Sequence, residues 1–260
     1  MRTIGIIPAR MGSSRFPGKP LVSILGAPMV VHVYFRARMC TSLDAVYVAT
    51  PDQEIRASAE RYGVPVIMTS PHHERATDRV AEAVERTEDR SEIVVNIQGD
   101  EPMLYPEMVD APVRALAEDP TLVCTNPVAR IRDRETFENR NVIKVVTDRG
   151  GLVLYMSREP IPTTVRLGDA VPMYQQLVVL PFRRDFLKTF TRLPQTPLEQ
   201  AESVDMLRVL EYGYKIKAVE VPRVTISVDV PSDVARIEAA LRHDPLVDGY
   251  LPRLRLQGSE

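Results

Sequence analysis

The feature that most constrains the fold is an alternation of short apolar runs with helical patterns over the first hundred residues. Apolar runs predict buried strands at residues 4–7, 45–50, 64–68 and 92–97. Helical patterns follow the first three runs, at residues 28–38, 51–62 and 80–88. Strands joined by helices of this length favour a mostly parallel sheet with helices on both faces. The chain is therefore predicted to be an α/β protein whose strand-to-helix loops gather at one sheet edge.

The second half of the chain is less regular. We expect further strands at residues 122–128, 141–146, 152–156 and 215–219, and an extended run at 174–180. The second and third of these strands flank a turn at 148–151 and are predicted to form a hairpin. Helices are expected at 103–117, 183–190, 198–212 and 234–242, a proline-containing loop or arm at 157–172, and an irregular tail at 243–260. A small antiparallel lobe or dimerisation arm therefore accompanies the expected parallel sheet.

Composition limits the possible partners and the compartment. The formal net charge of −2 gives no overall positive field for nucleic acid. The two cysteines, Cys40 and Cys124, match no metal or redox spacing, so we expect buried thiols in a reducing compartment. No apolar run approaches the roughly 20 residues of a membrane span, and the start is too short for a signal peptide. We therefore expect a cytoplasmic protein without a membrane partner.

A cationic loop follows the first predicted strand. The strand stops at Pro8, which has no N–H for a sheet ladder. The loop then carries three cations and two glycines: Arg10, Arg15, Lys19, Gly12 and Gly18. Glycines let backbone N–H groups approach phosphate oxygens, and the cations can neutralise them. Three cations alone would fit a solvated surface loop, but the glycines and the position after the first strand favour phosphate binding.

Two carboxylates follow the fourth predicted strand at the same edge. They belong to the segment 98–102, in which Asp100 and Glu101 are adjacent. Carboxylates beside a phosphate site suit Mg²⁺, which usually takes one or two of them together with phosphate oxygens and water. The alternative is a turn whose acidic residues cap the helix expected at 103–117. Taken in isolation, the segment fits that turn better.

These motifs together resemble the CMP-Kdo synthetase family, the 3-deoxy-manno-octulosonate cytidylyltransferases. The resemblance spans roughly residues 1–242 and rests on several segments that are specific only in combination. They are the opening loop at 6–20 and the segments 95–103, 155–162, 207–213 and 228–231, the last containing Asp-x-Pro.

The resemblance implies a Rossmann-like fold of the nucleotide-diphospho-sugar transferase type, usually a homodimer. It also implies transfer of CMP from CTP to an acceptor hydroxyl with release of pyrophosphate. We accordingly expect one domain at 1–242, with a nucleotide-binding half at about 1–120, an acceptor-binding and dimerisation part at about 121–230, and a tail at 243–260. The implied catalytic residues are Arg10, Lys19 and Asp100. The implied nucleotide-binding residues are Pro8, Ala9, Arg10, Gly12, Ser13, Arg15, Lys19, Arg75, Thr77 and Gln98. The implied Mg²⁺ ligands are Asp100 and Asp229, each expected directly after a strand.

The sequence departs from the family at the acceptor end. The family's His-x-Gly-x-Tyr becomes Gln176, Val178 and Leu180, and its Glu-Gln becomes Asp205-Met206. The implied acceptor-binding residues are Gln98, Arg158, Gln176, Leu180, Asp205 and Met206. An apolar site would leave the hydroxyls of a Kdo-type acid unpaired, at about 1–3 kcal/mol each. The acceptor is therefore either a Kdo-type acid, by family, or a carboxylated phosphonate such as phosphonoformate, which the lost motif favours.

Three other functions are alternatives to a cytidylyltransferase. A nicotinamide oxidoreductase needs Gly-x-Gly-x-x-Gly after the first strand, and the spacing of Gly12 and Gly18 does not provide it. A binding protein that has lost catalysis is disfavoured by the retention of Lys19, Asp100 and Asp229. A donor other than CTP is disfavoured only by the family resemblance.

Overall fold

A computed structural model of the chain describes residues 1–13, 16–166, 172–252 and 254. The chain forms two compact units. Unit 1 comprises Met1–Pro106 together with Thr225–Glu260, and unit 2 comprises Glu107–Val224. The two ends of the chain therefore belong to the same unit.

Unit 1 is built on a parallel sheet with the strand order β5–β4–β1–β6. The strands are β1 (Thr3–Pro8), β4 (Ala45–Thr50), β5 (Val66–Met68) and β6 (Ile93–Ile97). In β1, Ile4 lies opposite Ala45 of β4 and Val94 of β6. Every residue of β6 is buried, as are the first five of β1. Because side chains alternate along a strand, this burial means that both faces of the sheet are covered.

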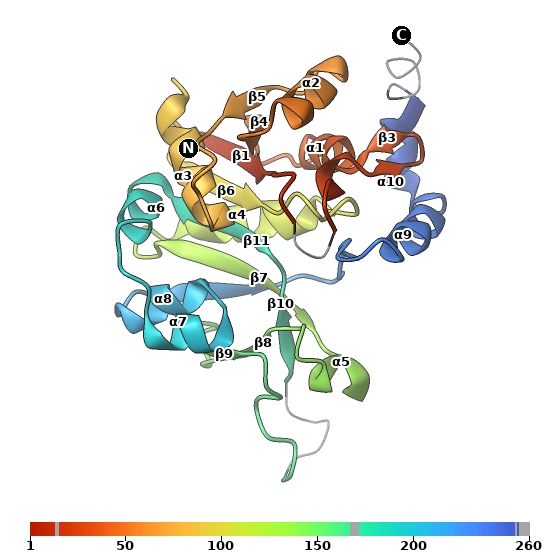
Figure 1. Ribbon diagram of the computed structural model, residues 1–260. Coiled ribbons are helices and arrows are strands. Elements are labelled where there is room, and N and C mark those ends of the chain that lie inside the picture. The colour runs from red at the N-terminus through yellow and green to blue at the C-terminus, as the bar shows by residue number, and fades with distance from the viewer. Residues whose placement is uncertain (14–15, 167–171, 253, 255–260) are drawn as a thin grey trace. The chain divides into compact units, whose positions relative to one another are not determined.

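Helices and a small ribbon complete unit 1. They are the 3₁₀ turn η1 (Lys19–Leu21), the strands β2 (Ser23–Ile24) and β3 (Ala27–Pro28), and the helices α1 (Met29–Ala37), α2 (Gln53–Arg61), α3 (Ala76–Arg86), α9 (Asp233–Leu241) and α10 (Pro245–Asp248). Helices α1 and α3 both contact β1 and β4. The C-terminal helices α9 and α10, drawn in blue, lie beside the red α1 and β3 (Figure 1).

Unit 2 is organised around β7. This strand pairs antiparallel with β10 and β11 and parallel with β12, while β8 pairs antiparallel with β9 and β10. The strands are β7 (Cys124–Arg130), β8 (Lys144–Thr147), β9 (Val153–Ser157), β10 (Tyr174–Gln176), β11 (Val179–Arg183) and β12 (Ile216–Glu220). The helices are α4 (Glu107–Glu118), α5 (Arg134–Glu138), α6 (Arg184–Phe190), α7 (Pro197–Glu202) and α8 (Met206–Glu211). The expected α/β class and the hairpin of β8 and β9 are confirmed.

The structure corrects several expected elements. Helix α3 begins at Ala76 rather than at residue 80. The helix expected at 198–212 is two helices, because Ser203 takes a left-handed conformation with φ 52° and ends α7. Helix α4 begins at Glu107, four residues later than expected. The short helix α5 was not expected at all; its N-cap Asp133 accepts the Thr136 N–H at 2.7 Å.

The C-terminal segment is also more ordered than expected. Residues 243–252 include α10, and Tyr250 is 2% exposed. The segment before Asp229 is not a strand, so the expectation that this carboxylate follows one was wrong. Of the expected arm at 157–172, residues 167–171 lie outside the described part of the chain.

Both cysteines are buried and form no disulfide, as expected, and burial raises the pKa of Cys124. Within the part of the chain that the structure describes, no helix has the length and apolar character needed to cross a bilayer.

Candidate active site

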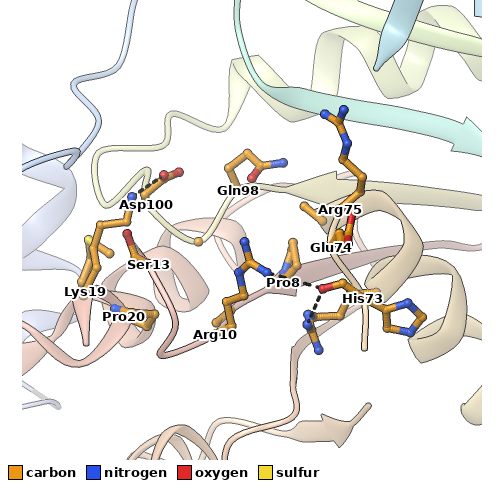
Figure 2. A pocket seen from close by; sticks show the side chains of 15 residues that line it. Pro8, Arg10, Ser13, Lys19, Pro20, His73, Glu74, Arg75, Gln98 and Asp100 are labelled. Carbon is orange, nitrogen blue, oxygen red and sulfur yellow. Dashed lines mark hydrogen bonds and ion pairs between the residues drawn. The ribbon is translucent and has the colours of Figure 1, made fainter. Parts of the chain in front are cut away.

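A pocket of about 320 Å³ opens in unit 1 where β1 and β6 end and α3 begins. This is the carboxyl edge of the parallel sheet, at which open α/β sheets bind ligands. Figure 2 shows the lining side chains. They are Pro8, Ala9, Arg10, Ser13, Lys19, Pro20, Met29, His73, Glu74, Arg75, Ala76, Arg79, Gln98, Gly99 and Asp100.

The opening loop is folded back on itself beside this pocket. Its Met11 N–H donates to the Asp52 carboxylate at 2.8 Å, and its Met11 carbonyl accepts the Gly18 N–H at 3.0 Å. Gly18 has φ 73°, a conformation in which a side chain would be strained, and it directly precedes η1. The glycine thereby turns the chain so that Lys19, the first residue of η1, lines the pocket.

Lys19 joins three segments that are distant in sequence. Its Nζ donates to Asp100 Oδ2 at 2.7 Å and to the Val228 carbonyl at 2.8 Å. The Val228 N–H in turn donates to the Asp100 carbonyl at 3.0 Å. The side chains of Lys19 and Asp100 are 14% and 30% exposed, so both remain within reach of a ligand. The cation of the opening loop and the carboxylate after β6 therefore meet at one edge, as the sequence predicted.

Three carboxylates lie close together at this point. Glu101, 7% exposed, follows Asp100. The pKa of Glu101 is raised to about 8, mainly by burial and also by the nearby charges of Asp100 and Asp229, while the hydrogen bond with Thr225 and the charge of Lys19 act in the opposite direction. Asp100 lines the pocket, whereas Glu101 is buried and is not among the lining residues.

The donor set suits Mg²⁺ only in part. Asp100 and Asp229 are hard oxygen donors, joined through the hydrogen bond between Val228 and Asp100. No group of three or more His, Cys, Asp or Glu side chains is arranged to hold a metal, as far as the described residues go. Two carboxylates are nevertheless what a Mg²⁺ ion that also binds substrate phosphates normally takes from the protein.

The opposite end of the pocket is formed by the segment that leads into α3. Arg75 is the N-cap residue of this helix. Thr77 is 1% exposed and accepts a hydrogen bond from the Asn96 amide at 3.3 Å. The Gln98 amide donates to Asn96 Oδ1 at 3.4 Å, which links the residue after β6 to α3. Thr77 therefore supports the wall of the pocket from behind, while Arg75 and Gln98 line it.

Arg79 is a pocket residue that sequence reasoning did not identify. It is 3% exposed, and its Nη1 donates to the Thr69 hydroxyl at 2.7 Å and the Ser70 carbonyl at 3.0 Å. Burial and, to a lesser extent, the charge of Arg10 lower the pKa of Arg79. The sequence predicted that this helix starts at residue 80, so Arg79 fell outside the expected helix. In the structure the helix begins at Ala76, and Arg79 in its first turn lines the pocket.

The structure brings most expected nucleotide-binding and catalytic residues to this pocket. Those lining it are Pro8, Ala9, Arg10, Ser13, Lys19, Arg75, Gln98 and Asp100. Gly12 is not among the lining residues, and Arg15 lies outside the described residues. Their roles in binding and catalysis remain predictions.

The expected acceptor-binding residues other than Gln98 belong to unit 2. Leu180, in β11, is 1% exposed, and Met206, the first residue of α8, is fully buried. Asp205 is the N-cap residue of α8. Leu180 and Met206 are thus core positions, where a change of polarity acts on packing.

Gln176 and Arg158 make polar contacts within unit 2. The Gln176 amide donates to Asn126 Oδ1 at 2.8 Å. The Arg158 guanidinium donates to three backbone carbonyls: from Nε to Glu202 at 2.7 Å, from Nη1 to Arg140 at 3.2 Å and from Nη2 to Ser203 at 3.4 Å. Arg158 therefore fixes backbone in this structure, and its part in acceptor binding remains a prediction.

The fold and the site define a class: an α/β protein with a cationic, carboxylate-bearing pocket at the carboxyl edge of a parallel sheet, which is typical of nucleotide-binding enzymes. Residues 4–216 match the cytidylyltransferase family. The chain therefore belongs to this family of CTP-dependent nucleotidyltransferases, in its 3-deoxy-manno-octulosonate branch.

Curated relatives support this assignment over nearly the whole chain. The 3-deoxy-manno-octulosonate cytidylyltransferase of Syntrophobacter fumaroxidans is 45% identical over 250 residues, covering 94% of this chain and 98% of its own. The enzyme of the same name from Syntrophotalea carbinolica is 41% identical over 250 residues, covering 93% and 99%. The mitochondrial enzyme of Arabidopsis thaliana is 41% identical over 243 residues, covering 93% and 83%.

Two solved structures share the fold of this chain. A CMP:2-keto-3-deoxy-manno-octonic acid synthetase complexed with CTP superposes with a TM-score of 0.88 at 36% identity, covering 93% of this chain and 99% of its own. A 4-diphosphocytidyl-2C-methyl-D-erythritol synthase from Anaerococcus prevotii, at 14% identity and a TM-score of 0.63, shares the fold.

Proposed function

We propose that this protein transfers CMP from CTP to a Kdo-type 3-deoxy-ulosonic acid and releases pyrophosphate. The observation that carries the proposal is the junction of Lys19, Asp100 and Val228 in the pocket of unit 1. It places a cation and a carboxylate at the end of a pocket lined by Arg10. The structure of a relative complexed with CTP supports CTP as the donor.

The chemistry follows from this placement. An acceptor hydroxyl loses its proton to solvent and forms a new bond to the α-phosphorus of CTP, while the bond from that phosphorus to the bridging oxygen of the pyrophosphate breaks. Negative charge grows on the departing pyrophosphate, so the Arg10 and Lys19 cations stabilise the transition state by neutralising it. In-line transfer at phosphorus requires alignment and charge more than covalent participation by the protein.

Asp100 and Asp229 are the residues that would hold Mg²⁺. Their oxygen donors and their proximity suit a cation shared with the triphosphate. When bound, Mg²⁺ would supply additional positive charge to the phosphates and to the attacking oxygen. The Lys19 Nζ, which donates to Asp100 in this structure, would then share that carboxylate with the cation or turn toward the triphosphate.

The buried positions in unit 2 bear on the acceptor. Leu180 and Met206 are core residues, so their apolar character does not by itself create an apolar binding site. The three curated relatives described above are all named for 3-deoxy-manno-octulosonate. Both observations support a Kdo-type acid, and neither the comparisons nor the fold supports the phosphonate alternative.

The family resemblance also supports a homodimer in the cytoplasm. Light scattering on the purified protein is expected to give twice the mass of the chain, and a monomeric mass would contradict the dimer.

Pyrophosphate release tests the reaction and the metal ligands together. We expect the wild type to release pyrophosphate when CTP, Kdo and Mg²⁺ are all present, and much less when any one is omitted. Asp100→Asn keeps the size but loses the charge that would bind the cation, so release is expected to fall by about 10²-fold or more. Asp185→Asn, at an exposed position on α6, is the matched control. Unchanged release by Asp100→Asn would refute the metal assignment.

A further inference from the structure

Glu82, on α3, is the centre of a set of contacts that no step of the proposed reaction uses. Its Oε2 accepts the Ser70 N–H at 2.8 Å and lies 2.6 Å from His73 Nε2, and its Oε1 pairs with Arg86 at 2.5 Å. Burial alone would raise the pKa of Glu82, but the hydrogen bonds from Ser70 and His73 hold it below its ordinary value. The carboxylate therefore ties down both ends of the segment 70–73 in its charged form.

The same segment is also held by two arginines, through its backbone carbonyls. The His73 carbonyl accepts from Arg79 Nη2 at 3.4 Å and from Arg10 Nη1 at 3.5 Å. Arg79 also donates to the Ser70 carbonyl. The segment is thus held by the Glu82 carboxylate and by two cations, Arg79 of α3 and Arg10 of the opening loop.

This segment leads directly into one wall of the pocket. His73, Glu74, Arg75 and Ala76 all line the pocket. Figure 2 shows Lys19, Ser13 and Asp100 gathered at one end, His73, Glu74 and Arg75 at the other, and Arg10 and Gln98 between them. If the Lys19 end takes the triphosphate, as the proposed function requires, the nucleoside lies against the wall at 73–76.

We propose that Glu82 is a positioning residue for the nucleoside end of the pocket: through Ser70 and His73 it holds the 73–76 wall where cytidine binds. This inference rests on the proposed function, because it takes CTP as the ligand. Glu82 does not line the pocket, so it acts only through the segment it anchors. Loss of the anchor leaves the Lys19 end intact, since no contact of Glu82 reaches Lys19, Ser13 or Asp100 among the described residues.

A substitution at Glu82 separates the two ends of the pocket. Glu82→Gln keeps the shape but removes the charge that strengthens the bonds to His73 and Arg86. We expect the Kd for CTP, measured by titration calorimetry, to rise about tenfold, because binding must then order the wall. The Kd for inorganic tripolyphosphate is expected to stay within twofold, because Glu82 makes no contact with the phosphate end and Arg10 meets the segment only at the His73 carbonyl, at 3.5 Å, as far as the described residues go. In turnover, KM for CTP should rise while kcat changes by less than threefold.

Two further variants serve as a control and as an independent test of the same contact. Glu85→Gln makes the same chemical change at an exposed position of α3 and is expected to leave both Kd values unchanged. His73→Gln removes the contact from the other partner and leaves α3 untouched, so it remains informative if Glu82→Gln does not fold; because His73 itself lines the pocket, its effect is interpreted together with the double variant. Glu82→Gln and His73→Gln break one shared contact. The fold increase in the Kd for CTP of the double variant should therefore be well below the product of the fold increases of the two single variants.

The outcomes are distinct. A CTP affinity unchanged in both Glu82→Gln and His73→Gln overturns the inference, and so does an equal weakening of CTP and tripolyphosphate, which would show damage to the whole pocket. If the wild type itself fails to bind CTP, the proposed function fails and this inference fails with it. Selective loss of CTP binding supports it.

Discussion

At the scale of single residues, unit 1 contains polar side chains whose partners lie far away in sequence. His32 is fully buried in α1, and its Nε2 lies 2.7 Å from the Ile24 carbonyl while its Nδ1 lies 3.0 Å from the Tyr250 hydroxyl. A neutral ring with its proton on Nε2 satisfies both contacts. The partners of His32 could not be read from a sequence pattern, because Tyr250 is 218 positions away.

His32 should therefore make the protein acid-sensitive. Burial, together with the charge of Arg36, lowers the pKa of His32 to about 4 from the ordinary value of 6.5, against the opposing hydrogen bond to Ile24. Because the unfolded state takes up a proton first, stability is lost as the pH falls from about 6.5 to 4, by about 3 kcal/mol in total. Urea unfolding at intervals across this range should show a steeper loss in the wild type than in His32→Gln. His243→Gln, at an exposed position, should keep the wild-type slope, and equal slopes in all three proteins would contradict the account.

Lys19 is the residue on which we predict that phosphate binding depends most. Lys19→Met removes the positive charge beside Asp100 and is expected to lower kcat/KM for CTP by about 10²–10³-fold, the usual cost of losing one transition-state donor. Steady-state kinetics with a pyrophosphate assay would measure it. Lys188→Met, exposed on α6, is the control, and a Lys19→Met enzyme within threefold of the wild type would exclude a catalytic role.

At the scale of elements, the regular strands were predictable and the irregular helix ends were not. The strand at 45–50 was predicted to the residue, because a buried parallel strand leaves an apolar run bounded by polar residues. The interruption at Ser203 was missed, since a left-handed residue other than glycine leaves no sequence signal. The early start of α3, which carries Arg79 and positions Arg75, depends likewise on tertiary contacts.

Helices α7 and α8 are joined by a buried ion pair, which we expect to be essential for the stability of unit 2. Arg208 donates to both oxygens of Glu199, at 2.7 and 2.5 Å, and the two side chains are 5% and 0% exposed. Glu199→Ala leaves a buried guanidinium unpaired, so the free energy of unfolding should fall by about 3–5 kcal/mol. The exposed Arg56–Glu60 pair provides the contrast: Glu60→Ala should cost about 0.5 kcal/mol or less. Urea unfolding of both variants measures this, and similar losses in the two would contradict the role of burial.

At the scale of the whole molecule, the sequence predicted a phosphate-binding pocket at the sheet edge but not all of the residues that form and support it. The opening loop and Asp100 could be placed because each follows a buried strand, and parallel strands share one carboxyl edge. Thr77, Arg79 and Glu82 could not be assigned their places, since burial and hydrogen-bond partners come only from the folded chain. Nor could the sequence show that the C-terminal segment packs into the same unit as the first strand.

That C-terminal segment is predicted to be required for stability. Asp244 pairs at 2.8 Å with Arg36 of α1, whose side chain is 0% exposed. Asp244→Ala leaves this buried cation without its carboxylate and should lower the free energy of unfolding by about 3–5 kcal/mol. Asp248→Ala, at an exposed position of α10 nearby, should change it by less than about 0.5 kcal/mol. Chemical denaturation measures the free energy of unfolding of both variants. If Asp244→Ala lowers it as little as Asp248→Ala does, the C-terminal segment is not required for stability.

The central claim is that the pocket between Lys19 and Arg75 moves CMP from CTP to a Kdo-type acid. Mass spectrometry of parallel reactions containing the protein, CTP and Mg²⁺ with either Kdo or phosphonoformate tests this most directly. The account predicts a CMP–Kdo product formed with one pyrophosphate per turnover, and no comparable phosphonate product. A CMP–phosphonoformate product without CMP–Kdo would contradict it.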